Sequence, residues 1–157
     1  MNLLNPDEET YMRMALREAE KAYASQEVPV GAVIVYDRQV IARAHNQVEM
    51  LNDATAHAEV LAITQASVQL EDWRLVDATM YVTKEPCAMC AGAMVNTRLG
   101  GVVFGVTDPR SGAAGSALDV TGFTGMLHQV PVVSGVLQEE CLALLQKFFQ
   151  QRRAEEK

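Results

Sequence analysis

The sequence predicts a three-layer α/β/α fold, in which helices cover both faces of a central five-stranded mixed sheet. Two observations support this class. Five short apolar segments have the length and β-branched content of buried strands, and segments with helical periodicity separate most of them. The first two strands are joined by a tight turn and run antiparallel, whereas strands joined by a helix run parallel, so the sheet is mixed.

The chain has the length of one domain. Its 157 residues are 49% hydrophobic and 21% charged, which is close to the average of globular proteins. A chain of this size buries enough surface to fold without disulfides. We therefore expect a single domain over residues 1–157.

The first predicted element is an amphipathic helix that begins near Asn5 and Pro6. A cap-forming Asn followed by Pro and three acidic residues is typical of a helix amino terminus, where backbone N–H groups are unpaired. Apolar residues then recur at helical spacing, at Met12, Ala15, Leu16, Ala19, Ala22 and Tyr23.

A hairpin is expected next, with strands over residues 30–36 and 39–44 joined by a turn at Asp37 and Arg38. Strands and helices then alternate. Helices are expected over residues 56–66, 88–97 and 138–153, and strands over residues 79–83, 101–106 and 130–133. Residues 108–116 form a loop rich in Gly, Ala and Ser. Cys141 falls on the apolar stripe of the last helix and is expected to be a core residue.

The overall charge argues against a nucleic-acid-binding protein, because the net charge is −7. The acidic excess is concentrated in the amino-terminal half. Residues 1–84 contain seven basic and thirteen acidic groups, whereas residues 85–157 contain six and seven. A local basic patch in the second half therefore remains compatible with the composition.

Several features indicate a cytoplasmic protein. The longest apolar runs are shorter than the ~18 residues of a membrane span, so no membrane association is expected. The amino terminus has neither the basic nor the apolar region of a secretory signal. The three cysteines cannot form a complete disulfide framework, and two of them are spaced as Cys87-x-x-Cys90. In a chain without a leader, this spacing indicates metal or redox chemistry in a reducing compartment.

Two short strings contain the residues best suited to chemistry. Residues 55–59 include His57 and Glu59, and residues 85–90 include Cys87 and Cys90. Both strings fall where a strand or loop becomes a helix. Two cysteines at positions i and i+3 of a first helical turn share one face and can bind one ion. The helix amino terminus also favours their thiolate form.

His57 adds an imidazole to these thiolates and completes a set of three ligands. A structural zinc site normally has four protein ligands, so three leave one position for water. Glu59 lies about 200° around a regular helix from His57 and need not bind the ion. It is therefore available as a general acid and base beside the water. A structural zinc site or a redox pair is the alternative interpretation of Cys87 and Cys90.

These strings resemble the zinc-dependent cytidine/deoxycytidylate deaminase superfamily, and nearly the whole chain resembles its bacterial tRNA-specific adenosine deaminases. The similarity covers residues 27–33, Asn46, and residues 55–59, 81–83, 85–93, 103–105, 111–116 and 148–153. The loop at residues 111–116 and the Phe-Phe-x-x-Arg-Arg ending are the most discriminating. The resemblance implies a cytidine-deaminase-like fold and a homodimer that forms its RNA site from both chains.

The resemblance also implies the reaction, which is hydrolytic conversion of adenosine to inosine at the wobble position of a tRNA anticodon. One Zn²⁺ per subunit, held by His57, Cys87 and Cys90, would lower the pKa of a water molecule. The resulting hydroxide would attack C6 of the adenine ring. Glu59 would carry the proton to the ring and to the departing ammonia.

The same resemblance assigns the substrate contacts. Asn46 and the backbone around Ala58 would contact the flipped base. Asp108 would meet the ribose or backbone of the anticodon loop, where the 2′-hydroxyl distinguishes RNA from DNA. The pocket wall would be formed by Val28, Pro29 and Phe149, and phosphate contacts by Arg152 and Arg153.

The sequence departs from the family pattern outside the zinc motif. Asn96 stands where a His is common, Leu127 where an Asn is more frequent, and Gln129 where an Arg is more frequent. Two other functions fit the zinc motif. One is a zinc deaminase of a free base or nucleoside, such as guanine or cytosine/cytidine. The other is a non-catalytic zinc-binding module, for which Glu59 has no use.

Overall fold

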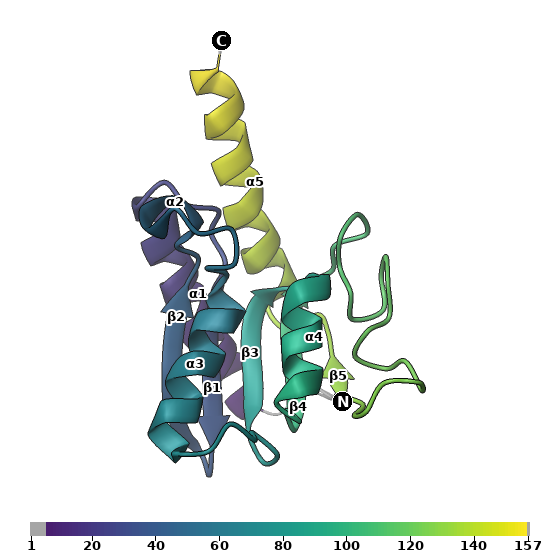
Figure 1. The fold of residues 1–157 in the computed structure, drawn as a ribbon. Coiled ribbons are helices and arrows are strands. Elements are labelled where there is room, and N and C mark those ends of the chain that lie inside the picture. The colour runs from purple at the N-terminus through teal and green to yellow at the C-terminus, as the bar shows by residue number, and fades with distance from the viewer. Residues whose placement is uncertain (1–5, 157) are drawn as a thin grey trace.

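The computed structural model describes residues 6–156 and contains five helices and five strands (Figure 1). In chain order they are α1 (Pro6–Ala24), β1 (Gly31–Tyr36), β2 (Gln39–His45), α2 (Val48–Leu51), α3 (Ala58–Leu70), β3 (Thr79–Lys84), α4 (Ala88–Asn96), β4 (Gly101–Val106), β5 (Val132–Val133) and α5 (Gln138–Glu155). The predicted cap Asn5 lies outside the described residues.

The five strands form one mixed sheet, as the sequence predicts. Their order is β2-β1-β3-β4-β5. β1 is antiparallel to β2 and to β3, whereas β3, β4 and β5 are parallel to one another. The carboxyl ends of the parallel strands therefore lie at one edge, where ligands bind in α/β sheets.

Two apolar clusters fill the space between the sheet and its helices. The alternation of side chains along β1 sends Ala32 and Ile34 into one cluster and Val33 and Val35 into the other. α3 and α4 cover the first face, and α1 and α5 cover the second (Figure 1). Three layers result. The predicted core residue Cys141 is buried in the second cluster.

The contact between α1 and β1 is unusually close at Gly31. A Cβ atom at this position would lie 2.1 Å from the carbonyl oxygen of Ala15 in α1. Only Gly allows the two backbones to approach this closely. The segment that follows α1 and carries Val28 is therefore held against the sheet, whereas Asn46 follows β2 at the other end of the hairpin.

The elements differ from the predicted ones mainly at their ends. α2 was not predicted, and β5 pairs over two residues instead of four. α3 begins at Ala58 instead of Ala56, because the N–H of Ala56 donates to Asp53 and His57 is an extended cap residue. α3 continues to Leu70, where the left-handed backbone of Glu71 ends it.

The amino termini of two helices position the residues of the predicted site. α3 begins after His57 and α4 begins after Cys87, and both cap residues have extended backbones. The two amino termini lie side by side near the carboxyl end of β3 (Figure 1). Among residues 6–156, none of the helices has both the length and the apolar composition that crossing a membrane requires.

Candidate active site

A group of three metal-ligand side chains lies between the amino termini of α3 and α4. The Nδ1 atom of His57 is 3.6 Å from the Sγ atom of Cys87 and 3.5 Å from that of Cys90. The ligand atoms all lie within 4.8 Å of one another, and no other such group occurs among the described residues. One nitrogen and two sulfur donors at these separations fit a zinc ion.

The pKa values within this group reflect its tight packing. Hydrogen bonds with Cys90 and His57 lower the pKa of the Cys87 thiol to about 3. The bond to Cys87, together with burial, raises the pKa of Cys90. The hydrogen bond between His57 and Cys87 raises the pKa of His57. Cys87 therefore carries a thiolate, which is the form of cysteine that binds metals.

Glu59 is a buried carboxyl group in the first turn of α3. Only 4% of its surface is exposed, although Glu is almost never fully buried unless it is paired. Burial raises the pKa of Glu59. Its side chain lines the same cavity as His57 and Cys87, so a carboxyl group stands beside the metal-ligand group without belonging to it.

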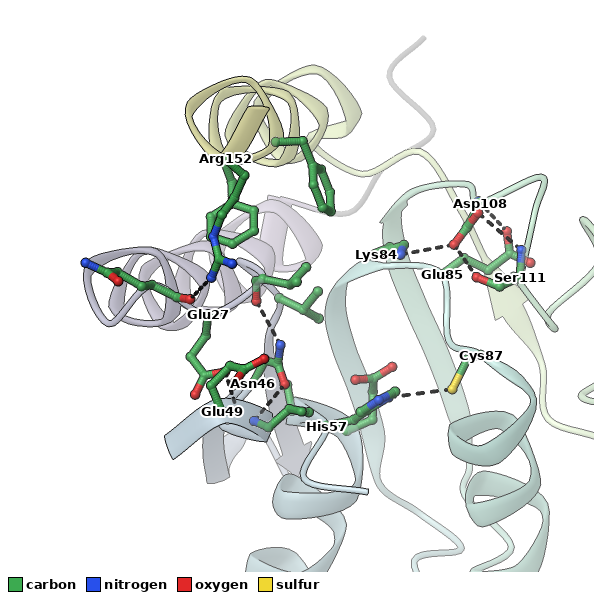
Figure 2. Close-up of a pocket in the computed structure, with 18 of the residues that line it drawn as sticks. Glu27, Asn46, Glu49, His57, Lys84, Glu85, Cys87, Asp108, Ser111 and Arg152 are labelled. Carbon is green, nitrogen blue, oxygen red and sulfur yellow. Dashed lines mark hydrogen bonds and ion pairs between the residues drawn. The ribbon is translucent and has the colours of Figure 1, made fainter. Parts of the chain in front are cut away.

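The cavity has a volume of about 470 Å³ and contains most of the predicted site residues (Figure 2). Those that line it are Val28, Asn46, His57, Ala58, Glu59, Cys87, Asp108, Phe149 and Arg152. Three predicted residues do not line it. Cys90 and Pro29 are buried, and Arg153 is exposed on α5.

Asn46 joins two segments of the cavity wall. Its Nδ2 atom donates to the carbonyl oxygen of Val28 over 3.2 Å, and its Oδ1 atom accepts from the N–H of Val48 over 3.3 Å (Figure 2). The amide is therefore fixed in orientation, with only 8% of the residue exposed. This position explains why Val28 and Asn46, far apart in the sequence, share one wall.

Asp108 lies on the opposite side of the cavity, after β4. Its carboxylate accepts from the Ser111 hydroxyl over 2.7 Å and forms an ion pair with Lys84 at 3.0 Å (Figure 2). Burial opposes the ionisation of Asp108, but the bonds from Ser111 and Lys84 outweigh it and hold its pKa well below the usual range. The carboxylate is thus charged and fixed at the rim.

Sequence reasoning missed the role of Glu85. Its carboxylate is 3% exposed and accepts from the backbone N–H groups of Asp108, Ala114 and Ser116 over 3.0–3.1 Å. The Ser116 hydroxyl donates to it over 2.5 Å. Glu85 thereby fixes the loop at residues 108–116 next to Cys87. An acidic residue directly before the Pro-Cys string was the available signal.

Glu27 was also missed, and it has a similar role on the other wall. Its carboxylate is 1% exposed and accepts from the N–H groups of Glu49 and Met50 over 2.9 and 2.8 Å. These bonds satisfy the amino terminus of α2. No local sequence signal connects Glu27 with a helix more than twenty residues later.

The carboxyl-terminal residues reach the cavity unequally. Arg152 donates to the carbonyl oxygen of Gln26 over 2.7 Å and lies 5.0 Å from the ring of Phe148. It therefore ties α5 to the segment before β1 (Figure 2). Phe148 is buried, whereas Phe149 is 42% exposed at the cavity.

The three positions that depart from the family pattern lie outside the cavity. Asn96 and Leu127 are exposed. Gln129 is also exposed, and its Nε2 atom donates to the carbonyl oxygens of Phe123 and Met126. Gln129 thus stabilises its own loop.

Comparison with known proteins finds relatives over nearly the whole chain. Residues 6–153 match the model of the MafB19-like deaminase family. The chain is 48% identical to the tRNA-specific adenosine deaminase of Bacillus subtilis, over 96% of this chain and 93% of that protein. It is 45% identical to the enzyme of the same name from Haemophilus influenzae, over 96% of this chain and 87% of that protein.

Solved structures show the same fold. A structure from studies of A-to-I editing by tRNA A34 deaminases superposes with a TM-score of 0.84 at 41% identity, over 87% of this chain and 99% of that one. The guanine deaminase of Nitrosomonas europaea has a TM-score of 0.77 at 23% identity, over 93% of this chain and 85% of that one, and supports the fold alone. By its relatives and its architecture, the chain belongs to the family of tRNA-specific adenosine deaminases.

Proposed function

We propose that this protein hydrolyses adenosine to inosine at the wobble position of a tRNA anticodon, with water consumed and ammonia released. The observation that carries this proposal is the buried Glu59 carboxyl group, which shares one cavity with His57 and Cys87. A non-catalytic zinc module has no use for it. The names of the relatives at 48% and 45% identity supply the substrate class.

We propose one zinc ion per chain, held by His57, Cys87 and Cys90. The donor set supports this assignment, since three protein ligands leave a position for water. When bound, zinc makes water acidic enough to provide a hydroxide nucleophile at neutral pH.

Glu59 moves the protons in this proposal. Its carboxylate accepts a proton from the attacking water and delivers it to N1, the ring nitrogen next to C6 of adenine. Glu59 then takes the proton of the new C6 hydroxyl group and delivers it to the exocyclic amine, so that ammonia leaves as the C6–N bond breaks and the C6 carbonyl of inosine forms. Burial of Glu59 supports this role, because a carboxyl group shielded from bulk water keeps the proton within the site.

The cavity walls hold the base. A volume of about 470 Å³ suits a flipped nucleoside, since small-molecule pockets span roughly 300–1,000 Å³. We assign the base contacts to Asn46 and the backbone at Ala58. Val28 and Phe149 form apolar walls, and Pro29 is buried next to Val28 in the chain.

The RNA surface extends from the cavity rim. Asp108, which is charged and fixed by Ser111, is assigned to the 2′-hydroxyl or backbone of the anticodon loop. Arg152 and Arg153 are assigned to phosphates. Because its proposed substrate is tRNA, we propose that the protein acts in the cytoplasm. We also propose that residues 1–157 form a single domain.

We also propose a homodimer that packs through α4. This helix carries a row of small residues, Ala91, Gly92 and Ala93, and its amino terminus supplies Cys87 and Cys90 to the site. Ala91 is buried within the chain, whereas Gly92 is half-buried and a Cβ there would meet no atom within 4 Å. Gly92 therefore leaves room for a partner helix.

The experiment that tests this function measures ammonia release from an anticodon stem-loop with adenosine at the wobble position. Free adenosine, cytidine and guanine are assayed beside it, and a Glu59→Ala variant is the control. We expect release from the stem-loop and none from the variant. Faster release from guanine or cytidine than from the stem-loop would favour the free-base alternative.

A further inference from the structure

Acidic residues outnumber basic ones in the lining of the cavity, which is unfavourable for an RNA substrate. Its acidic lining residues are Glu27, Glu49, Glu59, Glu85, Asp108 and Glu156, whereas its lysines and arginines are Lys84 and Arg152. A phosphodiester entering this cavity would meet an excess of negative charge. A cation with free donors is needed near the rim to position it.

Arg152, which is assigned to a phosphate above, lies across the cavity from Asp108 (Figure 2). Its guanidinium donates to the carbonyl oxygen of Gln26 and stacks on Phe148. Lys84 is placed differently. It ends β3, pairs with Val106 of β4, and lies at the edge where the parallel strands end. Its side chain is 31% exposed and points across the cavity rim toward Asp108 (Figure 2).

The ion pair with Asp108 holds the ammonium group of Lys84 but does not use all of its hydrogen-bond donors. Both oxygens of Asp108 have partners within the chain, since Oδ1 accepts from the N–H groups of Arg110 and Ser111, and Oδ2 accepts from the Ser111 hydroxyl. Lys84 adds its bond to Oδ2 at 3.0 Å. An ammonium group has three donors. Asp108 takes one of them and leaves two for the cavity.

We propose that Lys84 binds a phosphodiester of the RNA next to the target nucleoside, and that Asp108 holds the ammonium group in place for this contact. This inference rests on the proposed function and names a further residue that positions its substrate. Asp108 alone would repel the phosphate. Paired with Lys84, Asp108 instead fixes a positively charged group at the cavity, in a chain whose net charge is −7.

The test compares Lys84→Met, Lys84→Arg and Lys21→Met. Lys21 is a matched control, because it forms an ion pair with Glu18 at the same 3.0 Å but does not line the cavity. Both methionine variants lose one positive charge. The readouts are kcat and KM for the anticodon stem-loop between ~50 and ~200 mM salt.

We expect Lys84→Met to raise KM roughly tenfold with little change in kcat, and to reduce the slope of log affinity against log salt by ~0.7 to 1. Lys84→Arg should keep most of the slope, and Lys21→Met all of it. An unchanged KM and slope in Lys84→Met, or an equal change in Lys21→Met, would overturn the inference. If the wild-type protein does not deaminate the stem-loop, the proposed function itself fails.

A second comparison tests whether Asp108 holds the ammonium group for the phosphate contact. In an Asp108→Asn background, Lys84→Met should reduce the salt slope by less than it does in the wild-type background, because the amide no longer holds the ammonium group through an ion pair. An equal reduction in both backgrounds would show that Asp108 does not position Lys84.

Discussion

The Sγ atom of Cys90 lies 3.5 Å from the Nδ1 atom of His57, although 33 positions separate the two residues. The contact joins the amino termini of α3 and α4, which pack side by side on one face of the sheet. The packing of these two amino termini therefore brings the metal-ligand side chains together. Substitutions there should change metal binding before they change the fold.

The first prediction concerns the metal. We expect one zinc per chain, bound by two sulfur atoms, one nitrogen and water. His57→Ala and Cys90→Ser should each lose zinc and activity together, because a site with two ligands holds the ion far less tightly. Elemental analysis and X-ray absorption spectroscopy measure this. A fourth protein ligand in place of water would contradict a catalytic site.

The second prediction separates Glu59 from the ligands. Glu59→Ala should keep zinc, fold and RNA affinity but lose turnover by ~10⁴ or more, since general acid and base groups are typically worth ~10² to 10⁴ and this one serves several transfers. Single-turnover kinetics and zinc content check it. A variant that loses its zinc, or that stays within tenfold of wild type, would show that the proton carrier is another residue.

The third prediction concerns the loop held by Glu85. A Cβ added at Gly112 would lie 2.4 Å from the Glu85 carboxyl carbon and 2.6 Å from the carbonyl oxygen of Asp108. Gly112→Ala should therefore displace the loop that carries Asp108 and raise KM for the stem-loop. Glu85→Gln should cost ~2 kcal/mol or more in unfolding free energy, because an amide NH₂ would face backbone donors.

Hydrogen exchange at residues 108–116 provides the check for both variants. Faster exchange confined to this loop is the expected result. Unchanged exchange in Gly112→Ala, or exchange that rises equally throughout the chain, would contradict the role of Glu85 as the anchor of this loop.

The fourth prediction tests the dimer. Within the chain, a Cβ at Gly92 meets nothing within 4 Å, so Gly92→Ala should stabilise α4 in the folded monomer by roughly 0.5–1 kcal/mol. If a partner helix packs at this position, the same change should weaken the dimer. Light scattering over a range of concentrations measures the association. Undiminished dimerisation would place the interface elsewhere.

The fifth prediction uses the lowered pKa of Asp108. A carboxyl group whose folded pKa is depressed stabilises the protein above its unfolded pKa of ~3.9, and this contribution is lost as the pH falls through the folded value. Wild type should therefore exceed Asp108→Asn in unfolding free energy at pH 7. The difference should shrink below pH ~4.

Urea denaturation of both proteins at several pH values measures this difference. Any loss of zinc in acid affects both proteins alike and cancels in the comparison. A difference that stays constant down to pH ~3 would mean that the Asp108 carboxylate gains nothing from Ser111 and Lys84.

The sequence by itself determined the class of the fold and predicted the reacting groups. Apolar periodicity specified the strands and the faces of the long helices, because burial of alternate side chains does not depend on the details of packing. The spacing of Cys87 and Cys90 specified a shared helix face, and His57 with Glu59 completed the chemistry. Each of the two motifs is local, so the sequence alone reveals it, whereas the tertiary structure brings them together across 30 positions or more.

Only the tertiary structure decided how the cavity is held in shape. Glu27 caps α2, Glu85 anchors the loop at residues 108–116, and Lys84 pairs with Asp108. Each of these bonds joins residues more than twenty positions apart, and a carboxylate or an ammonium group has no periodicity that predicts its partner. The partners meet only after the sheet has brought the ends of β1, β3 and β4 together. They then pair because a buried polar group without a hydrogen-bond partner costs free energy.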